Sequence, residues 1–398
     1  MHPKWLLPEF VDDVLPQEAQ RVELIRRTIL DLFAGYGYEL VSPPLIEYLE
    51  SLLTGSGKDL ELQTFKLVDQ MSGKTLGIRA DVTPQIARLD SHLLGDEGVT
   101  RLCYADRVLR TRPIEGDMSR EVVQIGAELF GCSGIFADIE INRLLIQSIR
   151  SVVKRSLTLD LGSVSIAQSV ANWLALNPKA STTFYEGLQS KDTASLKEFS
   201  KDFDAEARKV IMALPTLYGD SSVLEVARTA LAKVPGADRG IDDLESVYQA
   251  VKDDVDYVAF DLAELRGFQY HSGLVVAVYV EGDATPIARG GRYNHVGEAF
   301  GRSRPATGFT IDLRRLSSCA SELLREDSQR KIWAPCVQDA PDLRAKIAEL
   351  RKDGDIVVED ILGQSLDLIG KGYTHTLVKN ERSWSVVVIG SKKQSTNQ

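Results

Sequence analysis

The sequence has no run of apolar residues long enough to cross a lipid bilayer. A membrane-spanning helix needs roughly 20 consecutive apolar residues, and no stretch of the 398-residue chain approaches that length. Residues 1–20 also lack the basic start and the apolar run that define a secretory signal peptide. We therefore expect a soluble, cytoplasmic protein that does not associate with membranes.

Cysteine and histidine are scarce, and neither is grouped in the chain. The four cysteines are too far apart for a CxxC zinc signature, and the five histidines are scattered. In an intracellular chain of this length, such cysteines are typical of reduced thiols packed in the core. The sequence thus predicts neither a metal site nor a bound cofactor. The residues concerned are Cys103, Cys132, Cys319 and Cys336, with His2, His92, His271, His295 and His375.

Basic residues are also in deficit. The chain has 47 lysines and arginines against 57 aspartates and glutamates, which gives a formal net charge of −10. A protein that binds nucleic acid normally carries a basic stripe or patch, whereas here the basic residues are interleaved with acidic ones. The charge balance therefore disfavours tRNA as a partner, although a local basic patch can still form in an acidic chain.

What the chain does contain is the composition of a globular protein. It is 43% hydrophobic and 26% charged, and its length suggests two or three domains. Apolar residues recur at helical spacing in residues 17–33, 84–94 and 139–153. Strand patterns, several of them in hairpins, cover residues 38–41, 66–69, 75–79, 103–110, 120–130, 257–261 and 274–280. Strands in hairpins with helices apart from them predict an α+β fold, an antiparallel sheet flanked by helices.

Composition divides the chain further. Residues 165–252 are rich in Ala, Lys and Asp, show helical periodicity and have no clear strands, so we expect a helical insertion there. Residues 321–329 are typical of a linker, and the polar tail SKKQSTNQ is typical of disorder. The predicted parts are 1–164 and 253–322 for the main domain, 165–252 for the insertion, and 330–392 for a small C-terminal α/β domain.

One predicted strand, residues 120–130, carries polar residues where a core is expected. Gln124, Gly126 and Glu128 share a face, because side chains alternate along a strand, and Gln124 and Glu128 are about 13 Å apart at ~3.3 Å per residue. Gly126 leaves a gap between them. Glu128 can accept from a cation and Gln124 can donate and accept, so this face predicts a small polar ligand; the alternative is a polar pair satisfied by buried neighbours.

Three other segments are candidates for binding, each with a plain structural alternative. Asp81 and Thr83 stand where a strand turns into a helix, and either can cap that helix instead. Arg266 offers a planar fork suited to a carboxylate or phosphate, or it is a surface arginine on a hairpin. Gly290 and Gly291 permit a close backbone approach, or they form an ordinary turn.

Taken together and in this order, the segments resemble the catalytic domain of histidyl-tRNA synthetase, a class II aminoacyl-tRNA synthetase, over roughly residues 8–320. The stretch GYELVSPPLIE looks like class II motif 1, with Pro44 at its proline. Residues 110–131 look like motif 2, and GFTIDLRRL looks like motif 3, with Arg315 at its arginine. RGFQYHSG is similar to the histidine-specific signature RGLDYYNG.

The resemblance implies a pocket for free histidine. In the family, the counterparts of Asp81, Thr83 and Glu128 hold the α-amino group, those of Arg110 and Gln124 lie near the carboxylate, and the tyrosine region contacts the imidazole. The implied histidine-binding residues are Asp81, Thr83, Arg110, Gln124, Glu128, Arg266, Tyr270 and His271.

The departures from the synthetase pattern fall where that family binds ATP. Arg112 replaces a glutamate that helps to bind adenine, and Val122 replaces the phenylalanine that stacks on it. Asp312 replaces a motif 3 glycine, and Arg314 replaces the glutamate of motif 3. A carboxylate beside a triphosphate repels it. The pattern implies an amino-acid pocket retained beside a degraded ATP site.

These features together resemble the family of ATP phosphoribosyltransferase regulatory subunits, whose opening is similar to residues 5–16. About 60 residues follow the linker here, fewer than the roughly one hundred of an anticodon-binding domain. The resemblance implies a non-catalytic allosteric subunit in the first step of histidine biosynthesis. It implies a homodimer core joined through motif 1, in a hetero-oligomer with a short catalytic phosphoribosyltransferase that histidine inhibits.

Two other functions stay open at this point. One is a working histidyl-tRNA synthetase, which forms histidyl-adenylate from ATP. The other is a histidine-binding sensor module with a different partner, which has no effect on phosphoribosyl transfer. The C-terminal domain also has a plain alternative, that of a solubilising remnant.

Overall fold

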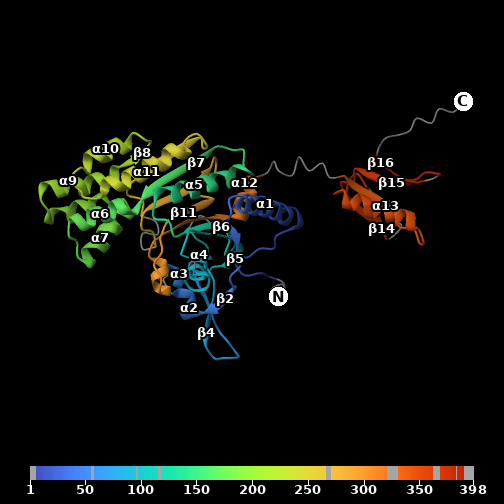
Figure 1. Ribbon diagram of the computed structural model, residues 1–398, viewed down its shortest axis with the longest axis horizontal. Coiled ribbons are helices and arrows are strands. Elements are labelled where there is room, and N and C mark those ends of the chain that lie inside the picture. The colour runs from blue at the N-terminus through green and yellow to red at the C-terminus, as the bar shows by residue number, and fades with distance from the viewer. Residues whose placement is uncertain are drawn as a thin grey trace. The chain divides into compact units, whose positions relative to one another are not determined.

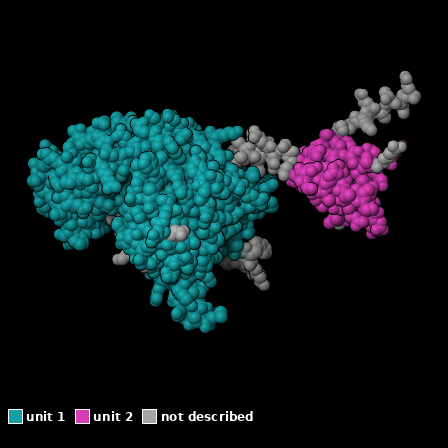
Figure 2. Space-filling view, viewed as in Figure 1, with its two compact units in different colours: residues 1–321 teal, residues 322–398 magenta. Residues whose placement is uncertain are grey.

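The computed structural model divides the chain into two compact units, residues 1–321 and residues 322–398 (Figure 2). The predicted four-part division is finer than this and stays a prediction. Arg266, the expected linker 321–329 and the polar tail lie outside the described residues. The structure describes residues 6–54, 58–95, 97–114, 119–265, 270–320, 330–361, 368–381 and 383–389.

A nine-stranded sheet forms the centre of the first unit (Figure 1). The strands from β5 to β7 pair antiparallel, while β1 pairs parallel with β5 and β7 pairs parallel with β9. The predicted α+β fold is confirmed, although the sheet is mixed at its edges and not wholly antiparallel. In spatial order the strands are β1 (Glu39–Leu40), β5 (Thr100–Leu109), β6 (Glu121–Phe130), β12 (Ala306–Asp312), β11 (Ala288–Arg292), β10 (Leu274–Val280), β7 (Leu157–Ser163), β9 (Tyr257–Asp261) and β8 (Tyr218–Gly219).

Three of these strands were not predicted: β7, β11 and the two-residue β8. β7 lies between β10 and β9, with Leu157, Leu159 and Leu161 fully buried on one face. β11 contains Gly290 and Gly291, so the alternative of an ordinary turn is wrong. Gly290 is required because a Cβ there would meet the Phe309 Cβ of β12 at 2.8 Å.

Helices cover one face of the sheet. The helix α1 (Pro16–Gly35) turns Ile25, Ile29 and Phe33 into the core, and the Phe33 ring meets Phe309 of β12 edge-on at 5.8 Å. Two more helices, α5 (Ile135–Arg150) and α12 (Leu313–Cys319), pack against β6 and β12. Because strand side chains alternate, Gly308 and Thr310 of β12 face the other side, where the pocket lies.

A smaller layer stands over that other side. The helix α4 (Thr83–Arg88) continues into a π-helix (Leu89–Leu94), and the core beneath it includes Val82, Ile86 and Tyr104. A three-stranded sheet lies next to it, and the β3–β4 hairpin predicted for residues 66–79 is confirmed. The elements of this sheet and its connections are β2 (Ile46–Tyr48), α2 (Leu49–Leu53), α3 (Lys58–Gln63), β3 (Phe65–Val68) and β4 (Thr75–Ile78).

The predicted insertion is helical, apart from the two residues of β8, which extend the central sheet. Side-chain caps start three of its helices: Asn177, Asp192 and Asp204 each accept from backbone N–H groups of the following turn. Its α-helices are α6 (Val164–Trp173), α7 (Pro178–Gln189), α8 (Thr193–Phe199), α9 (Ala205–Ala213), α10 (Val223–Ala230) and α11 (Ala237–Val251). Figure 1 shows them gathered in green and yellow beside β7 and β8.

The second unit is a small α/β domain. One helix, α13 (Pro341–Lys352), buries Leu343, Ile347 and Leu350 against a four-stranded sheet, as the spacing predicts. The strand order is β14 (Ile356–Asp360), β13 (Lys331–Pro335), β15 (His375–Lys379) and β16 (Trp384–Val388). None of the described helices in either unit is long and apolar enough to cross a membrane.

Candidate functional site

A cavity of about 220 Å³, here called the central cavity, opens on the face of the large sheet that α4 covers. The structure brings together at this cavity all seven of the described residues predicted to bind histidine. Those residues are Asp81, Thr83, Arg110, Gln124, Glu128, Tyr270 and His271. The other lining residues are Ile114, Arg289, Gly290, Gly291, Tyr293, Gly308, Phe309 and Thr310.

Glu128 lies at the floor of the cavity and is only 1% exposed. It pairs across β6 and β12 with Gly308, where any Cβ would collide with the Glu128 carboxyl group. The Tyr104 hydroxyl donates to its Oε1 at 3.2 Å, and the Tyr293 hydroxyl donates to its Oε2. Burial raises the pKa of Glu128 to about 8, and the hydrogen bond from Tyr293 opposes part of this rise.

The expected gap at Gly126 does not exist, because Tyr104 fills it. Tyr104 pairs with Gly126 across β5 and β6, and a Cβ at Gly126 would overlap the Tyr104 hydroxyl. That hydroxyl also lies 3.3 Å from Thr83 Oγ1, so Tyr104 connects Thr83 to Glu128. Sequence reasoning missed Tyr104, since its position over the glycine depends on the register between two strands.

Asp81 both supports the start of α4 and lines the cavity. Its Oδ1 accepts from the Thr83 backbone N–H at 3.3 Å and from the Thr83 hydroxyl at 3.4 Å. The N-cap of α4 is Val82 and has no side-chain capping hydrogen bond, so the capping alternative for Asp81 and Thr83 is wrong. The Asp81 carboxylate borders the central cavity. A second carboxyl group thus stands near Glu128, and its charge contributes to the raised pKa of Glu128.

Gln124 is held in one orientation by the backbone of the α4 layer. Its Oε1 accepts from the Val82 backbone N–H at 3.1 Å, and the residue is 3% exposed. Among the described residues, its amide nitrogen has no hydrogen-bond partner. The end of Gln124 that remains for a ligand is therefore a hydrogen-bond donor.

Tyr270 and His271 form an aromatic wall with Tyr293. The Tyr270 ring lies 5.0 Å from the Tyr293 ring and meets the His271 ring edge-on at 5.3 Å. Burial lowers the pKa of His271 to about 4, so its imidazole is neutral at physiological pH. Within the part of the chain that the structure describes, the buried Tyr270 hydroxyl and His271 Nδ1 have no hydrogen-bond partner. Such atoms usually cost about 1–3 kcal/mol each, which favours a polar ligand beside them.

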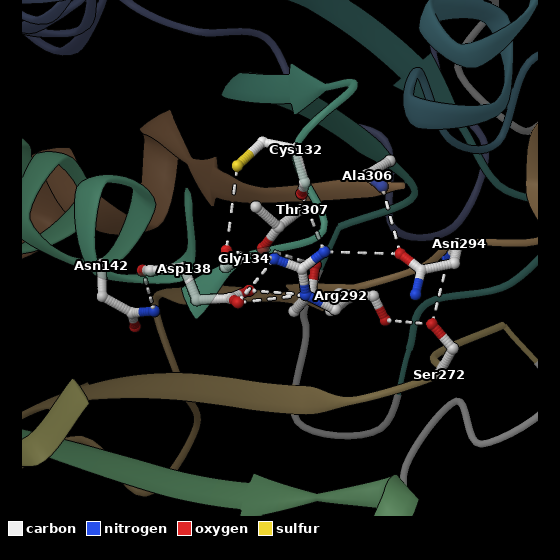
Figure 3. A network of polar contacts seen from close by, with 10 residues as sticks. Cys132, Gly134, Asp138, Asn142, Ser272, Arg292, Asn294, Ala306 and Thr307 are labelled. Carbon is white, nitrogen blue, oxygen red and sulfur yellow. Dashed lines mark hydrogen bonds and ion pairs between the residues drawn. The ribbon is translucent and has the colours of Figure 1, made fainter. Parts of the chain in front are cut away.

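The two arginines of the glycine-rich strand β11 have different places in the structure. Arg292 does not line the central cavity; it forms a buried ion pair with Asp138 of α5 at 2.6 Å (Figure 3). The same guanidinium donates to the carbonyl oxygens of Cys132 and Gly134 at 3.1 and 3.2 Å. Arg292 therefore ties β11 to α5, whereas Arg289 lines the cavity.

Two of the four positions that depart from the synthetase pattern, Val122 and Asp312, line a second, smaller cavity of about 50 Å³. It shares Arg110, Gln124, Arg289 and Thr310 with the central cavity. Asp312 lines it and caps α12 by accepting from the backbone N–H of Arg314 at 2.9 Å. Arg315 pairs with Asp283 at 2.7 Å. A carboxylate at this place is unfavourable for a triphosphate. The described residues hold no group of three His, Cys, Asp or Glu side chains arranged for a metal.

Sequence comparison matches both units to known families. A family model described as "Histidyl-tRNA synthetase" matches residues 10–316, and one described as "ATP phosphoribosyltransferase subunit HisZ C-terminal domain" matches residues 329–387. The ATP phosphoribosyltransferase regulatory subunit of Nitrosospira multiformis is 46% identical over 96% of this chain and 98% of its own. That of Burkholderia cenocepacia is 47% identical over the same shares.

Solved structures show the same fold at low identity. An ATP phosphoribosyltransferase regulatory subunit/histidyl-tRNA synthetase from Bacillus halodurans matches with a TM-score of 0.81 at 23% identity, over 94% of this chain and 98% of its own. Histidyl-tRNA synthetase from Nostoc sp. PCC 7120 matches with a TM-score of 0.76 at 18% identity, over 97% of each chain. The class II synthetase-like fold predicted from the motifs is thereby confirmed.

Proposed function

Because the chain belongs to the family of ATP phosphoribosyltransferase regulatory subunits, we propose that it activates a short catalytic ATP phosphoribosyltransferase and that its central cavity binds free histidine as the feedback signal. Histidine is the end product of the pathway that this transferase opens. The subunit senses histidine and has no catalysis of its own.

One observation carries the proposal: acidic and basic side chains line the same small cavity. Asp81 and Glu128 supply carboxyl groups, and Arg110 supplies a guanidinium. A free amino acid carries an ammonium and a carboxylate on one carbon, so it complements both charges at once. Each charge-assisted hydrogen bond of this kind contributes about 1.5–3 kcal/mol.

The polar groups of the cavity orient the amino acid. Asp81, Thr83 and Glu128 receive its ammonium group, and the hydrogen-bond donors of Arg110 and Gln124 receive its carboxylate. The imidazole ring then lies against Tyr270 and His271, whose buried polar atoms have no partner among the described residues. An imidazole can donate to one such atom and accept from another.

A titration with histidine tests the site directly. The variant Glu128→Ala is compared with Glu121→Ala, since Glu121 lies on the same strand but pairs with Arg107 away from the cavity. We expect Glu128→Ala to weaken histidine binding about 10- to 100-fold, the loss of one charge-assisted bond, and Glu121→Ala to leave it unchanged. Equal affinity in both variants overturns the assignment of the site.

We also propose a homodimer core. Around the motif 1 segment, Leu40, Leu45 and Ile46 are 57%, 47% and 47% exposed, and Tyr48 is 45% exposed. These residues lie on β1, β2 and the loop between them, where class II proteins pair. Clustered exposed apolar residues of this kind favour a protein interface. Sedimentation analysis of the full chain is expected to give the mass of a dimer, and a monomer at micromolar concentration contradicts it.

Feedback requires that histidine bind two states of the complex with different affinity, typically with a coupling of about 1–3 kcal/mol. A histidine sensor with another partner predicts histidine binding without any effect on phosphoribosyl transfer. A working histidyl-tRNA synthetase predicts histidine-dependent formation of an adenylate. The reconstituted reaction therefore separates the regulatory subunit from the other two functions, and adenylate formation separates those two from each other.

A further inference from the structure

We infer that Arg289 binds the carboxylate of the free amino acid and makes the central cavity selective for a ligand with a free carboxylate. The inference rests on the proposed function and adds a residue that the family resemblance does not name.

The register places Arg289 on the cavity face of the sheet. It pairs with Ala277 of β10 and with Thr310 of β12, and Thr310 pairs in turn with Gly126 of β6. Partners in such a row share a face. Arg289 therefore stands on the same face as Glu128, which lies one row further along.

Beside Glu128 the strands β12 and β11 contribute glycines to the floor of the central cavity. The row of Glu128 continues through Gly308 to Gly291. With ~4.8 Å between strands and ~3.3 Å per residue, the Cα atoms of Arg289 and Glu128 are about 12 Å apart. This backbone separation is long enough for a small zwitterion to lie between a guanidinium of Arg289 and the carboxyl group of Glu128, beside Thr310.

Arg289 also occupies a junction. It lines the central cavity, the smaller cavity next to Asp312, and a third cavity of about 50 Å³ that contains Asp160 and Glu264. An arginine at such a junction presents its planar fork to a bidentate carboxylate. With Arg110, it gives the central cavity two guanidinium groups to complement the carboxyl groups of Asp81 and Glu128.

A purely structural role makes a different prediction. If Arg289 serves only to balance Asp160 and Glu264, its loss weakens the site for every ligand alike. If it binds the ligand carboxylate, its loss weakens only ligands that carry one. The two roles therefore differ in selectivity and not only in affinity.

The experiment is a calorimetric titration of the full chain with histidine and with histidinol, in which a hydroxymethyl group replaces the carboxylate. Wild type is expected to prefer histidine at least tenfold. Arg289→Gln is expected to lose about 10- to 100-fold in histidine affinity, the range of one charge-assisted bond, and less than threefold in histidinol affinity. Arg289→Lys keeps the positive charge but lacks the planar guanidinium. Its histidine affinity is expected to lie between those of wild type and Arg289→Gln.

A matched control is Arg107→Gln, since Arg107 is an arginine of the same sheet that pairs with Glu121 outside the cavity. It is expected to bind both ligands as wild type does, and thermal unfolding checks that each variant is folded. If wild type binds neither ligand, the proposed histidine site itself is overturned. If wild type prefers histidine and Arg289→Gln keeps that preference, or loses both ligands equally, only the role of Arg289 is overturned.

Discussion

The Tyr293 hydroxyl donates a hydrogen bond to Oε2 of Glu128, and so joins the chain just after β11 to the C-terminal half of β6 at the floor of the central cavity. Tyr104 holds the other carboxyl oxygen at 3.2 Å. Both oxygens of one buried carboxyl group are thus fixed by phenols. In the proposed histidine site this carboxyl group is therefore held in one orientation before a ligand binds, and its protonation state can be measured.

Histidine binding is expected to release a proton. Ligand-free Glu128 has a pKa of about 8, so it is mostly protonated at pH 7. An ammonium group beside it favours the carboxylate and lowers that pKa. Calorimetry at pH 7 in two buffers of different ionisation enthalpy is expected to show a release approaching one proton per histidine, and tighter binding at pH 8 than at pH 6. Proton release that persists undiminished in Glu128→Gln contradicts this explanation.

Glu128 also gives the ligand-free protein a defined pH dependence of stability. Its pKa in the folded protein, about 8, lies above the usual value of 4.5. The contribution of Glu128 to the free energy of unfolding is therefore fully present below pH 4.5 and is lost as the pH rises through 8. Glu128→Gln has no such loss. Urea unfolding at pH 5, 7 and 9 is expected to show the variant gaining stability relative to wild type as the pH rises. A difference that does not change with pH argues against the buried, protonated carboxyl group.

The protein is expected to form no histidyl-adenylate. Asp312 and Val122, which stand where the synthetase resemblance implies ATP binding, line the smaller cavity with a carboxylate and without an aromatic ring for adenine. Exchange of labelled pyrophosphate into ATP with added histidine measures adenylate formation. We expect no exchange above the background without histidine, and histidine-dependent exchange would restore the synthetase function as the leading candidate.

Removal of the Arg292 side chain is expected to destabilise the first unit without a direct effect on ligand chemistry. Its partner Asp138 is 3% exposed, and a buried charge that loses its partner typically costs about 3–5 kcal/mol. Denaturant unfolding of Arg292→Ala is expected to show a loss of this size. Arg107→Ala, which breaks an exposed pair, is expected to cost less than about 1 kcal/mol.

Much of the fold could be predicted because local patterns agree with tertiary packing. The apolar spacing of α1 and α13 marks the faces that they bury, and the β3–β4 hairpin lies where the strand pattern and the turn residues place it. β7 was missed although Leu157, Leu159 and Leu161 alternate, because the segment is short and lies between two helical patterns. β11 was missed because its two glycines are typical of a turn, and only the neighbouring strand explains them.

In the candidate site too, some residues could be placed from local sequence patterns and others only from the pairing of strands. Gln124 and Glu128 could be placed on one face from the period of a strand, whereas Tyr104 over Gly126 depends on the register between β5 and β6. Arg289 carried no signal of its own, because its position on the same face as Glu128 follows from the order of three strands, β6, β12 and β11, of which β6 lies far from the other two in the sequence. Pairing of distant strands is not encoded in any local pattern.

The most direct test of the regulatory function is phosphoribosyl transfer from phosphoribosyl pyrophosphate to ATP, assayed with the short catalytic subunit from the same source. The rate is measured with and without this protein, and then with increasing histidine. We predict that this protein raises the rate, that histidine lowers it again, and that Glu128→Ala keeps the activation but loses the inhibition. A rate that is unaffected by this protein, or inhibition by histidine that survives in Glu128→Ala, would contradict the proposed sensor.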